Sequence, residues 1–198
     1  MRAYTSVGDT TAFSALYARH EGALFRFVRR LLGQRLAAQA EEVFQDCWLR
    51  VVTAQASFDP ERGLWKTWAF TLAHNLAMDR LRTSGREVSV DQHGAGDDDD
   101  SNASAHLEWL QLQLGKSAPA ADDLSHWRAA GQQLLQCLDA LPAAQRAAFL
   151  LHHEDGLSVD DVARALGLGF ETVKSRMRYA LHKLRGCMAA YLTWEGAT

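Results

Sequence analysis

Hydrophobic residues recur three and four positions apart along most of this chain, which is the period of an amphipathic helix. No segment alternates strictly between hydrophobic and polar residues, so no strand is predicted. The pattern predicts helices over about residues 13–31, 37–54 and 65–82, with Gly33 ending the first and Pro60 and Gly63 marking a loop before the third. The residues predicted to face inward are Phe44, Cys47, Trp48, Val51 and Val52 in the second helix and Trp65, Trp68, Leu72 and Leu76 in the third.

The helical period fades between about residues 83 and 118 and then returns. Residues 94–104 (GAGDDDDSNAS) are acidic, polar and glycine-bearing, a composition that predicts disorder. Residues 106–114 hold several leucines and Trp109, and are a candidate for a short helix. A helical pattern resumes at Leu124, and Pro142 starts a further helix. The predicted fold is therefore all-α, with two small helical domains (1–84 and 121–198) joined by an acidic flexible linker (85–120).

Residues 157–185 have the layout of a helix-turn-helix. Ser158 can cap a first helix, with Asp161 three residues on, and Gly167 ends that helix. A second helix is predicted from about Glu171, and its basic, hydrogen-bonding face suits the major groove of DNA. An ordinary amphipathic helix with a solvated basic face is the alternative. The inward residues of the second helix are Val173, Met177, Ala180, Leu181 and Leu184, and the opposite side carries Lys174, Ser175, Arg178, His182 and Arg185.

The charge is distributed unevenly, although the formal net charge is only -3. Residues 1–85 carry 11 Lys and Arg against 8 Asp and Glu, residues 86–128 carry 3 against 9, and residues 129–198 carry 7 against 7. An acidic connector between two less acidic domains follows from these numbers. Neither a signal-peptide core nor a membrane-length apolar stretch is recognised.

The remaining chemistry in the sequence is sparse. Cys47, Cys137 and Cys187 are far apart and form no CxxC motif, so reduced thiols in a cytosolic protein are expected. His152 and His153 beside two carboxylates suggest a metal site only weakly, since adjacent helical residues point in different directions. We therefore expect no metal and no cofactor. No set of nucleophile and base and no glycine-rich phosphate loop is found, so an enzyme is not predicted.

The order of these segments resembles that of the extracytoplasmic-function (ECF) group of bacterial RNA polymerase sigma factors. A helix-turn-helix alone is shared with many regulators, but these motifs in this order around a variable linker are specific. The resemblance rests on residues 40–52 (AEEVFQDCWLRVV), 57–63 (SFDPERG), 65–82 (WKTWAFTLAHNLAMDRLR), 138–158 (LDALPAAQRAAFLLHHEDGLS) and 172–185 (TVKSRMRYALHKLR). Departures include His74, where the family usually has Arg, and Tyr179 and Leu181, where it often has Arg.

The resemblance implies that the first domain binds core RNA polymerase, mainly the β′ clamp and also β, and reads the −10 promoter element. The acidic set on the second helix, whose alternative is an ordinary solvated face, is Glu41, Glu42, Gln45 and Asp46. Positions matching the pocket for a flipped −10 base are Ala54, Phe58, Asp59 and Asn75. Phe58 could instead pack into the bundle, and Asn75 could be a plain surface amide. Lys66, Arg80 and Arg82 would hold −10 phosphates.

The second domain is expected to read the −35 element as duplex. Lys174, Ser175, Arg178 and Tyr179 would reach base edges, and Thr172 and Arg176 would meet phosphates. The resemblance also implies an anti-sigma factor, a cytoplasmic location, and neither a small-molecule substrate nor membrane insertion. The acidic linker of this chain (85–120) either mimics nucleic acid or acts as a solubilising tether.

The sequence is compatible with two classes of function. The first is a promoter-specificity subunit that helps open the duplex for transcription initiation. The second is a stand-alone helix-turn-helix regulator that never joins polymerase and has no use for the predicted acidic face and −10 pocket.

Overall fold

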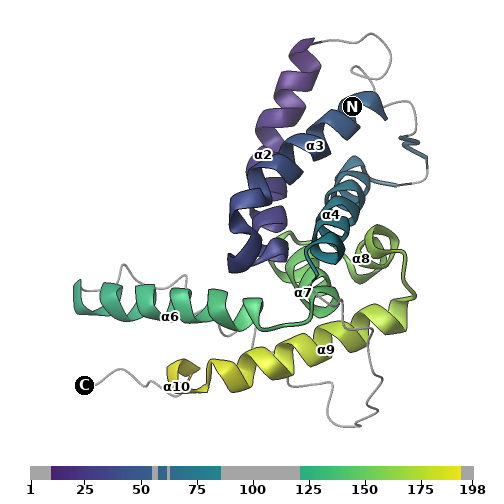
Figure 1. The fold of residues 1–198 in the computed structure, drawn as a ribbon. Coiled ribbons are helices and arrows are strands. Elements are labelled where there is room, and N and C mark those ends of the chain that lie inside the picture. The colour runs from purple at the N-terminus through teal and green to yellow at the C-terminus, as the bar shows by residue number, and fades with distance from the viewer. Residues whose placement is uncertain (1–9, 55–57, 62, 86–120, 193–198) are drawn as a thin grey trace.

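The computed structural model describes residues 10–54, 58–61, 63–85 and 121–192, and every regular element in that part is helical (Figure 1). This agrees with the predicted all-α fold. The predicted linker and the short helix at 106–114 lie outside the described residues, as does the end of the tail. The first domain consists of α2 (Thr10–Leu32), the 3-10 turn η1 (Gln34–Gln39), α3 (Ala40–Thr53) and α4 (Trp65–Thr83).

Gly33 ends α2 for two separate reasons. Its φ of 74° lies in the left-handed region, which costs glycine little and other residues more. A Cβ atom built there would also stand 1.9 Å from the Asp139 carboxylate and 2.8 Å from the Arg146 guanidinium. The predicted stop is therefore confirmed, and Gly33 also admits side chains from the second domain.

The core of the first domain lies where α2, α3 and α4 meet. Phe27 and Phe70 are almost completely buried there, with their ring centroids 5.2 Å apart in an edge-to-face arrangement. Val52 was predicted to be buried but is 39% exposed, because it points about 100° away from the buried Val51. Trp68 and Leu72 are only partly buried, since α4 turns its small residues Ala69, Ala73 and Ala77 to the core instead.

The second domain is also helical, and its helix-turn-helix matches the predicted boundaries closely. The Ser158 hydroxyl accepts a hydrogen bond from the Asp161 amide at 3.1 Å, and Gly167 adopts φ 65° as a left-handed cap. These two residues begin and end α8 as predicted. The elements are α6 (Ala121–Asp139), α7 (Ala143–Phe149), the π-helical turn η3 (Leu150–Glu154), α8 (Val159–Leu166), α9 (Phe170–Cys187) and α10 (Ala189–Leu192).

Helix α6 projects from the body of the molecule and runs alongside α9 (Figure 1). Its apolar residues predicted the helix correctly but do not form a buried side. Trp127, Leu134 and Leu135 are each 38–40% exposed, while Cys137 and Leu138 are buried. A hydrophobic period indicates a helix, but it does not say how much of the apolar side a neighbour covers.

Cys137 in α6 and Cys187 in α9 form a disulfide, with a Cα–Cα distance of 5.9 Å. The expectation of three reduced thiols is therefore wrong for this pair. The two residues are 50 positions apart in sequence, and only the packing of α6 along α9 brings them together. Cys47 is free and buried, and burial raises its pKa to about 12.

The two domains pack against each other, an arrangement that the sequence left open. Helix α8 lies on α4, and α6 and α7 lie against α2. Polar contacts that cross the boundary include Thr67 to Asp161, Lys66 to the Asp155 carbonyl, and Arg30 to Glu154. We call this the closed arrangement.

Candidate nucleic-acid interface

The acidic residues of α3 form an exposed surface. Glu41, Glu42, Gln45 and Asp46 are all exposed, on the side of α3 opposite the buried Val43, Phe44 and Cys47. The spacing of three and four residues puts them on one face. The Gln45 amide donates to Glu41 Oε1 at 3.5 Å, which leaves both side chains at the surface. The structure thus brings all four predicted residues together.

One member of this acidic set is already paired with a cation from α4. Arg80 Nη2 lies 2.7 Å from Glu42 Oε1, with the Glu42 side chain still 60% exposed. Arg82 pairs in a similar way with Asp79, one turn earlier on α4. Arg80 and Arg82 were both predicted to hold −10 phosphates, so DNA would compete with these carboxylates. At this exposure the pairs are worth little, and exchange of partner costs little free energy.

A pocket of about 230 Å³ lies between the loop after α3 and the first half of α4. Two of the predicted base-pocket residues line it, Phe58 and Asp59. The Phe58 ring packs against Trp68 with centroids 5.6 Å apart, and Asp59 Oδ1 accepts from the Glu61 amide at 2.9 Å. Aromatic walls and a polar edge suit an unstacked base. The full lining is Phe58, Asp59, Gly63, Leu64, Thr67, Trp68, Thr71 and Arg164.

The other two predicted base-pocket residues do not line this pocket. Ala54 is half-buried at the C-terminal cap of α3. Asn75 is exposed on α4, one turn beyond the lining residue Thr71. The row Thr67, Thr71 and Asn75 follows the i, i+4 spacing of one helix face. Asn75 therefore extends the pocket face along α4 rather than closing the pocket.

The sequence analysis missed Thr67, Thr71 and Arg164 as lining residues. The two threonines carried a usable signal, because β-branched polar residues four apart are unfavourable inside a helix without a reason. Arg164 carried none, since it belongs to α8 in the other domain. Only the closed arrangement brings it to the pocket.

Helix α8 covers part of the candidate −10 surface. The Thr67 hydroxyl donates to Asp161 Oδ1 at 3.1 Å, and Arg164 Nη2 reaches the same oxygen at 2.6 Å. Lys66, a predicted phosphate ligand, donates to the backbone carbonyl of Asp155 and is half-buried. A DNA strand cannot reach Lys66 and Thr67 while these contacts persist. The hydrogen bond from Ser158 is the main cause that lowers the pKa of Asp161, and burial opposes it.

The recognition helix α9 buries its predicted apolar side and shows the opposite side to solvent. Val173, Met177, Ala180 and Leu184 are buried, whereas Leu181 is only half-buried. Of the predicted −35 contacts, Arg178 is exposed, and Thr172, Lys174, Ser175, Arg176 and Tyr179 are half-exposed.

The first turns of α9 contain two further charge contacts. Lys174 Nζ lies 4.0 Å from Glu171 and 5.8 Å from the centre of the Phe170 ring. Arg176 lies near His74 of α4, where its charge and the burial of the ring lower the pKa of His74, with burial the larger cause. Arg176 is thus a predicted −35 contact near α4 of the first domain.

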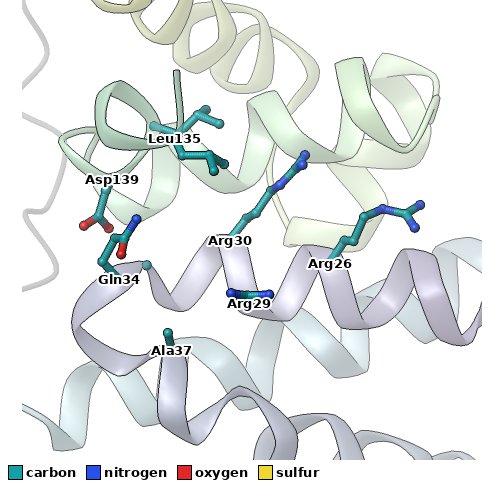
Figure 2. Close-up of a pocket in the computed structure, with 9 residues that line it drawn as sticks. Arg26, Arg29, Arg30, Gln34, Ala37, Leu135 and Asp139 are labelled. Carbon is teal, nitrogen blue, oxygen red and sulfur yellow. The ribbon is translucent and has the colours of Figure 1, made fainter. Parts of the chain in front are cut away.

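A larger hollow of about 320 Å³ lies between the end of α2 and α6. Figure 2 shows Arg26 and Arg30 rising from α2 toward the second domain, with Leu135 and Asp139 on the facing wall. Arg26 and Arg30 both pair with Glu154. The hollow is therefore part of the domain boundary.

Asp155 is the most perturbed carboxyl at this boundary. Burial and the neighbouring Glu154 raise its pKa to about 7, although Lys66, Arg26 and Arg30 act in the opposite direction. Its Oδ2 atom is buried without a hydrogen bond. Nearby, burial and His152 lower the pKa of His153 to about 4.

Two further properties concern the described residues alone. In that part of the chain, no three His, Cys, Asp or Glu side chains are arranged to hold a metal ion. Among its helices, none has the length and hydropathy that crossing a membrane requires.

Comparison with known proteins defines the class of both domains. Residues 16–87 match the family model "Sigma-70 region 2", and residues 131–184 match "Sigma-70, region 4". Helices α3 and α4 with the acidic surface fall in the first match, and the helix-turn-helix falls in the second. The architecture is that of a two-domain sigma-70-type protein.

Similar proteins narrow the class further. The chain is 31% identical over 185 residues to "ECF RNA polymerase sigma factor SigK" of Mycobacterium tuberculosis, covering 91% of this chain and 87% of the relative. It is 29% identical over 180 residues to the protein of the same name in Mycobacterium sp. (strain KMS), covering 91% and 84%. The chain belongs to the ECF group of the sigma-70 family.

Two solved structures share the fold. One is the sigma factor RpoE in complex with the anti-sigma factor NepR from Bartonella quintana, with a TM-score of 0.63, 23% identity and coverage of 91% of this chain and 98% of that one. The other is CnrH in complex with the cytosolic domain of CnrY, with a TM-score of 0.61, 22% identity and coverage of 95% and 94%.

The family assignment fixes the function. The chain is an RNA polymerase sigma factor, which binds core polymerase, recognises the −35 and −10 promoter elements and promotes opening of the promoter. The family is not one of catalytic enzymes. A stand-alone regulator receives no support, because region 2 accompanies the helix-turn-helix.

Proposed function

We propose that the acidic surface of α3 is the contact with core polymerase, mainly with the β′ clamp and also with β. The observation that carries this proposal is the single exposed face shared by Glu41, Glu42, Gln45 and Asp46. Carboxylates on such a face form charge-assisted hydrogen bonds with arginines of a partner. Glu42 would exchange Arg80 for a partner cation, which releases Arg80 for DNA.

The −10 element is then bound along α4. A flipped non-template base enters the pocket beside Phe58 and Asp59, and Asn75 contacts the strand one turn further on. Ala54 borders the loop, and Lys66, Arg80 and Arg82 bind phosphates. Lys66 is paired with the Asp155 carbonyl of the second domain, so its phosphate contact requires the domains to separate first, whereas Arg80 and Arg82 have exposed partners within the first domain.

The −35 element is read as duplex by α9. Lys174, Ser175, Arg178 and Tyr179 reach base edges, and Thr172 and Arg176 contact phosphates. Arg176 faces His74 across the domain boundary, so it too becomes available when the domains separate.

The remaining features follow from the family. The protein acts in the cytoplasm without catalytic activity, cofactor or metal of its own, and an anti-sigma factor holds it inactive. One structural neighbour was solved with an anti-sigma factor, and the other was solved with the cytosolic domain of CnrY.

Reconstituted transcription tests the proposal. The full chain is mixed with core RNA polymerase and a pool of promoters, and run-off products and holoenzyme are measured. The double variant E41Q/D46N should weaken holoenzyme formation by about tenfold or more, because two charge-assisted bonds are lost.

The matched control is Asp160→Asn, an exposed carboxylate on α8 outside the proposed contact. It should leave holoenzyme formation unchanged. If both variants weaken holoenzyme formation equally, the loss reflects the net charge of the protein and not a specific contact of the α3 surface. Failure of the wild-type chain to bind core would contradict the polymerase contact altogether.

A further inference from the structure

The hollow between the end of α2 and α6 has walls from both domains (Figure 2). Its volume of about 320 Å³ lies at the lower end of the range for sites that hold small molecules. Arg26, Arg29 and Arg30 line it from α2, and Leu135 and Leu138 line it from α6. One side of the hollow is therefore cationic, and the facing side is largely apolar.

The positive charge in the hollow exceeds the negative charge that faces it. The three arginines follow the i, i+3 and i+4 spacing of one helix face. Asp139, the one carboxylate among the described lining residues, accepts from the buried Arg146 at 2.7 Å, so its charge is already matched. Glu154, just outside the lining, is shared by Arg26, at 3.5 Å, and Arg30. Three guanidinium groups are thus left with one shared carboxylate.

Two ordinary explanations do not account for this excess. Cations in the last turn interact favourably with the helix dipole, which applies to Arg29 and Arg30 but not to Arg26, further from the end of α2. The nearby Asp155 does not neutralise the arginines, because burial is the main cause that raises its pKa to about 7. Arg29 is exposed, and no ion pair or hydrogen bond joins its guanidinium to another described residue. A cation of the hollow is therefore available to a ligand.

The facing wall leaves an apolar side chain in water. Leu135 is 40% exposed, although Leu138, three residues further along α6, is buried. The half-buried Ala37 adds to the apolar lining, and the exposed Gln34 amide can both donate and accept hydrogen bonds. A simple inorganic anion would leave Leu135 uncovered. The hollow therefore suits a ligand with an anionic head and an organic body.

We propose that this hollow binds an organic di- or triphosphate of nucleotide type, which bridges the two domains. Guanidinium groups bind phosphate oxygens through paired, charge-assisted hydrogen bonds. Arg29 and Arg26, the more exposed cations, bind the phosphates, whereas Arg30 keeps its contact with Glu154 and contributes its charge. The organic body of the ligand packs on Leu135.

The ligand contacts α2 in one domain and α6 in the other, so it binds the closed arrangement more tightly than separated domains. Bound ligand therefore favours closure and keeps α8 on α4. The consequence for transcription rests on the proposed function, since it assumes that α4 binds the −10 strand. The ligand site itself does not depend on that assumption.

Calorimetric titration of the full chain without magnesium tests the site, with pyrophosphate, ATP and adenosine as probes. Pyrophosphate should bind, and ATP should bind about tenfold more tightly, because its nucleoside part covers the apolar wall. Adenosine should bind more weakly than either probe, since it carries no phosphate. Absence of pyrophosphate binding at millimolar concentration would overturn the proposal, and so would tighter binding of adenosine than of pyrophosphate.

Two variants assign the two walls of the hollow. Arg29→Gln should weaken the binding of both pyrophosphate and ATP by about tenfold, because a charge-assisted hydrogen bond is lost. Leu135→Gln should weaken the binding of ATP alone. The matched control is Arg35→Gln, which removes an exposed arginine of η1 outside the lining and should leave all affinities unchanged. Equal weakening in Arg29→Gln and Arg35→Gln would show a general attraction of anions to a basic surface and would overturn the site.

Nucleic acid is another polyanion with the chemistry to bind these arginines. A single-stranded oligonucleotide should bind the wild type and Arg29→Gln with the same affinity. If Arg29→Gln weakens the binding of the oligonucleotide more than that of ATP, the arginines belong to a nucleic-acid surface, and the proposal of a small-ligand site is wrong.

Amide hydrogen exchange tests the bridge between the domains. Saturating ATP should slow the exchange of residues 66–71 of α4 about fivefold, because the closed arrangement becomes more populated. Unchanged exchange with ATP bound would overturn the bridging role. If the chain fails to associate with core polymerase both with and without ATP, the proposed polymerase contact fails, and titration and exchange still decide the ligand site.

Discussion

At the residue scale, the boundary between the domains concentrates groups whose protonation is shifted. The pKa of Asp155 is raised from 3.8 to about 7, so the folded protein holds this proton more tightly than the unfolded chain. Its contribution to the free energy of unfolding is complete below about pH 4 and is lost as the pH rises to about 7. The lowered pKa of His153 acts in the opposite direction between about pH 4 and 6.5. The pH dependence of stability is therefore the sum of two opposing contributions, one from Asp155 and one from His153.

Asp155→Asn isolates the carboxyl part of this dependence. The variant cannot ionise, so it should be more stable than the wild type at pH 8, by on the order of 1–3 kcal/mol, and about equal at pH 4. Urea unfolding at both pH values measures the difference. Asp160→Asn, at an exposed position on α8, should show the same slope of unfolding free energy against pH as the wild type. An unchanged slope in Asp155→Asn would mean that Asp155 titrates normally in the folded protein.

Arg178 is the residue on α9 whose exposure best suits a base contact. If it is bidentate to a guanine, Arg178→Ala should relax the −35 preference by about 1–3 kcal/mol. Competition binding between matched and mismatched −35 duplexes measures this preference. Lys183→Ala removes another exposed cation of α9 further from the predicted contacts, and should weaken all duplexes equally. Equal weakening in Arg178→Ala would mark Arg178 as a phosphate contact instead.

At the element scale, α8 depends on a single residue at its N-terminus. Ser158 accepts from the Asp161 amide, and its hydroxyl also donates to Asp161 Oδ2 at 2.6 Å. Ser158→Ala removes both contacts and should lower the free energy of unfolding by about 1 kcal/mol. Ser158→Thr retains a hydroxyl acceptor and should lose less than about half of that. Equal loss in both variants, measured by thermal unfolding, would show that the cap does not stabilise α8.

The elements were largely predictable because their signals are local. Gly33, Pro142, Ser158 and Gly167 define helix ends through backbone conformation and capping, which depend only on nearby residues. The spacing of hydrophobic residues alone predicted the buried side of α9, apart from Leu181, which is half-buried. Burial was less predictable in α4 and α6, since a helix with small residues on one side can turn either side to a neighbour. Trp68 in α4 and Leu135 in α6 show this limit.

At the scale of the whole molecule, the pairing of distant segments carried no local signal. The disulfide joins residues 50 positions apart, and Arg164 meets Phe58 and Asp59 only because α8 docks on α4. The same docking pairs the predicted DNA ligand Lys66 with the Asp155 carbonyl. The sequence predicts candidate site residues, whereas the accessibility of these residues depends on contacts between the domains.

The contact between Thr67 and Asp161 provides a direct way to shift the closed arrangement. Thr67→Val keeps the shape of the side chain and removes the hydroxyl that donates to Asp161 Oδ1 across the boundary. A hydrogen bond of this kind contributes about 1 kcal/mol net, so the fraction of separated molecules should rise about fivefold. Energy transfer between dyes on unnatural amino acids at Leu49 and Lys183, both exposed, measures that fraction. Thr71→Val is the matched control, because the Thr71 hydroxyl donates to the Thr67 carbonyl within α4. If both variants leave the separated fraction unchanged, apolar packing of α8 on α4 holds the domains together, and the polar contacts only set their register.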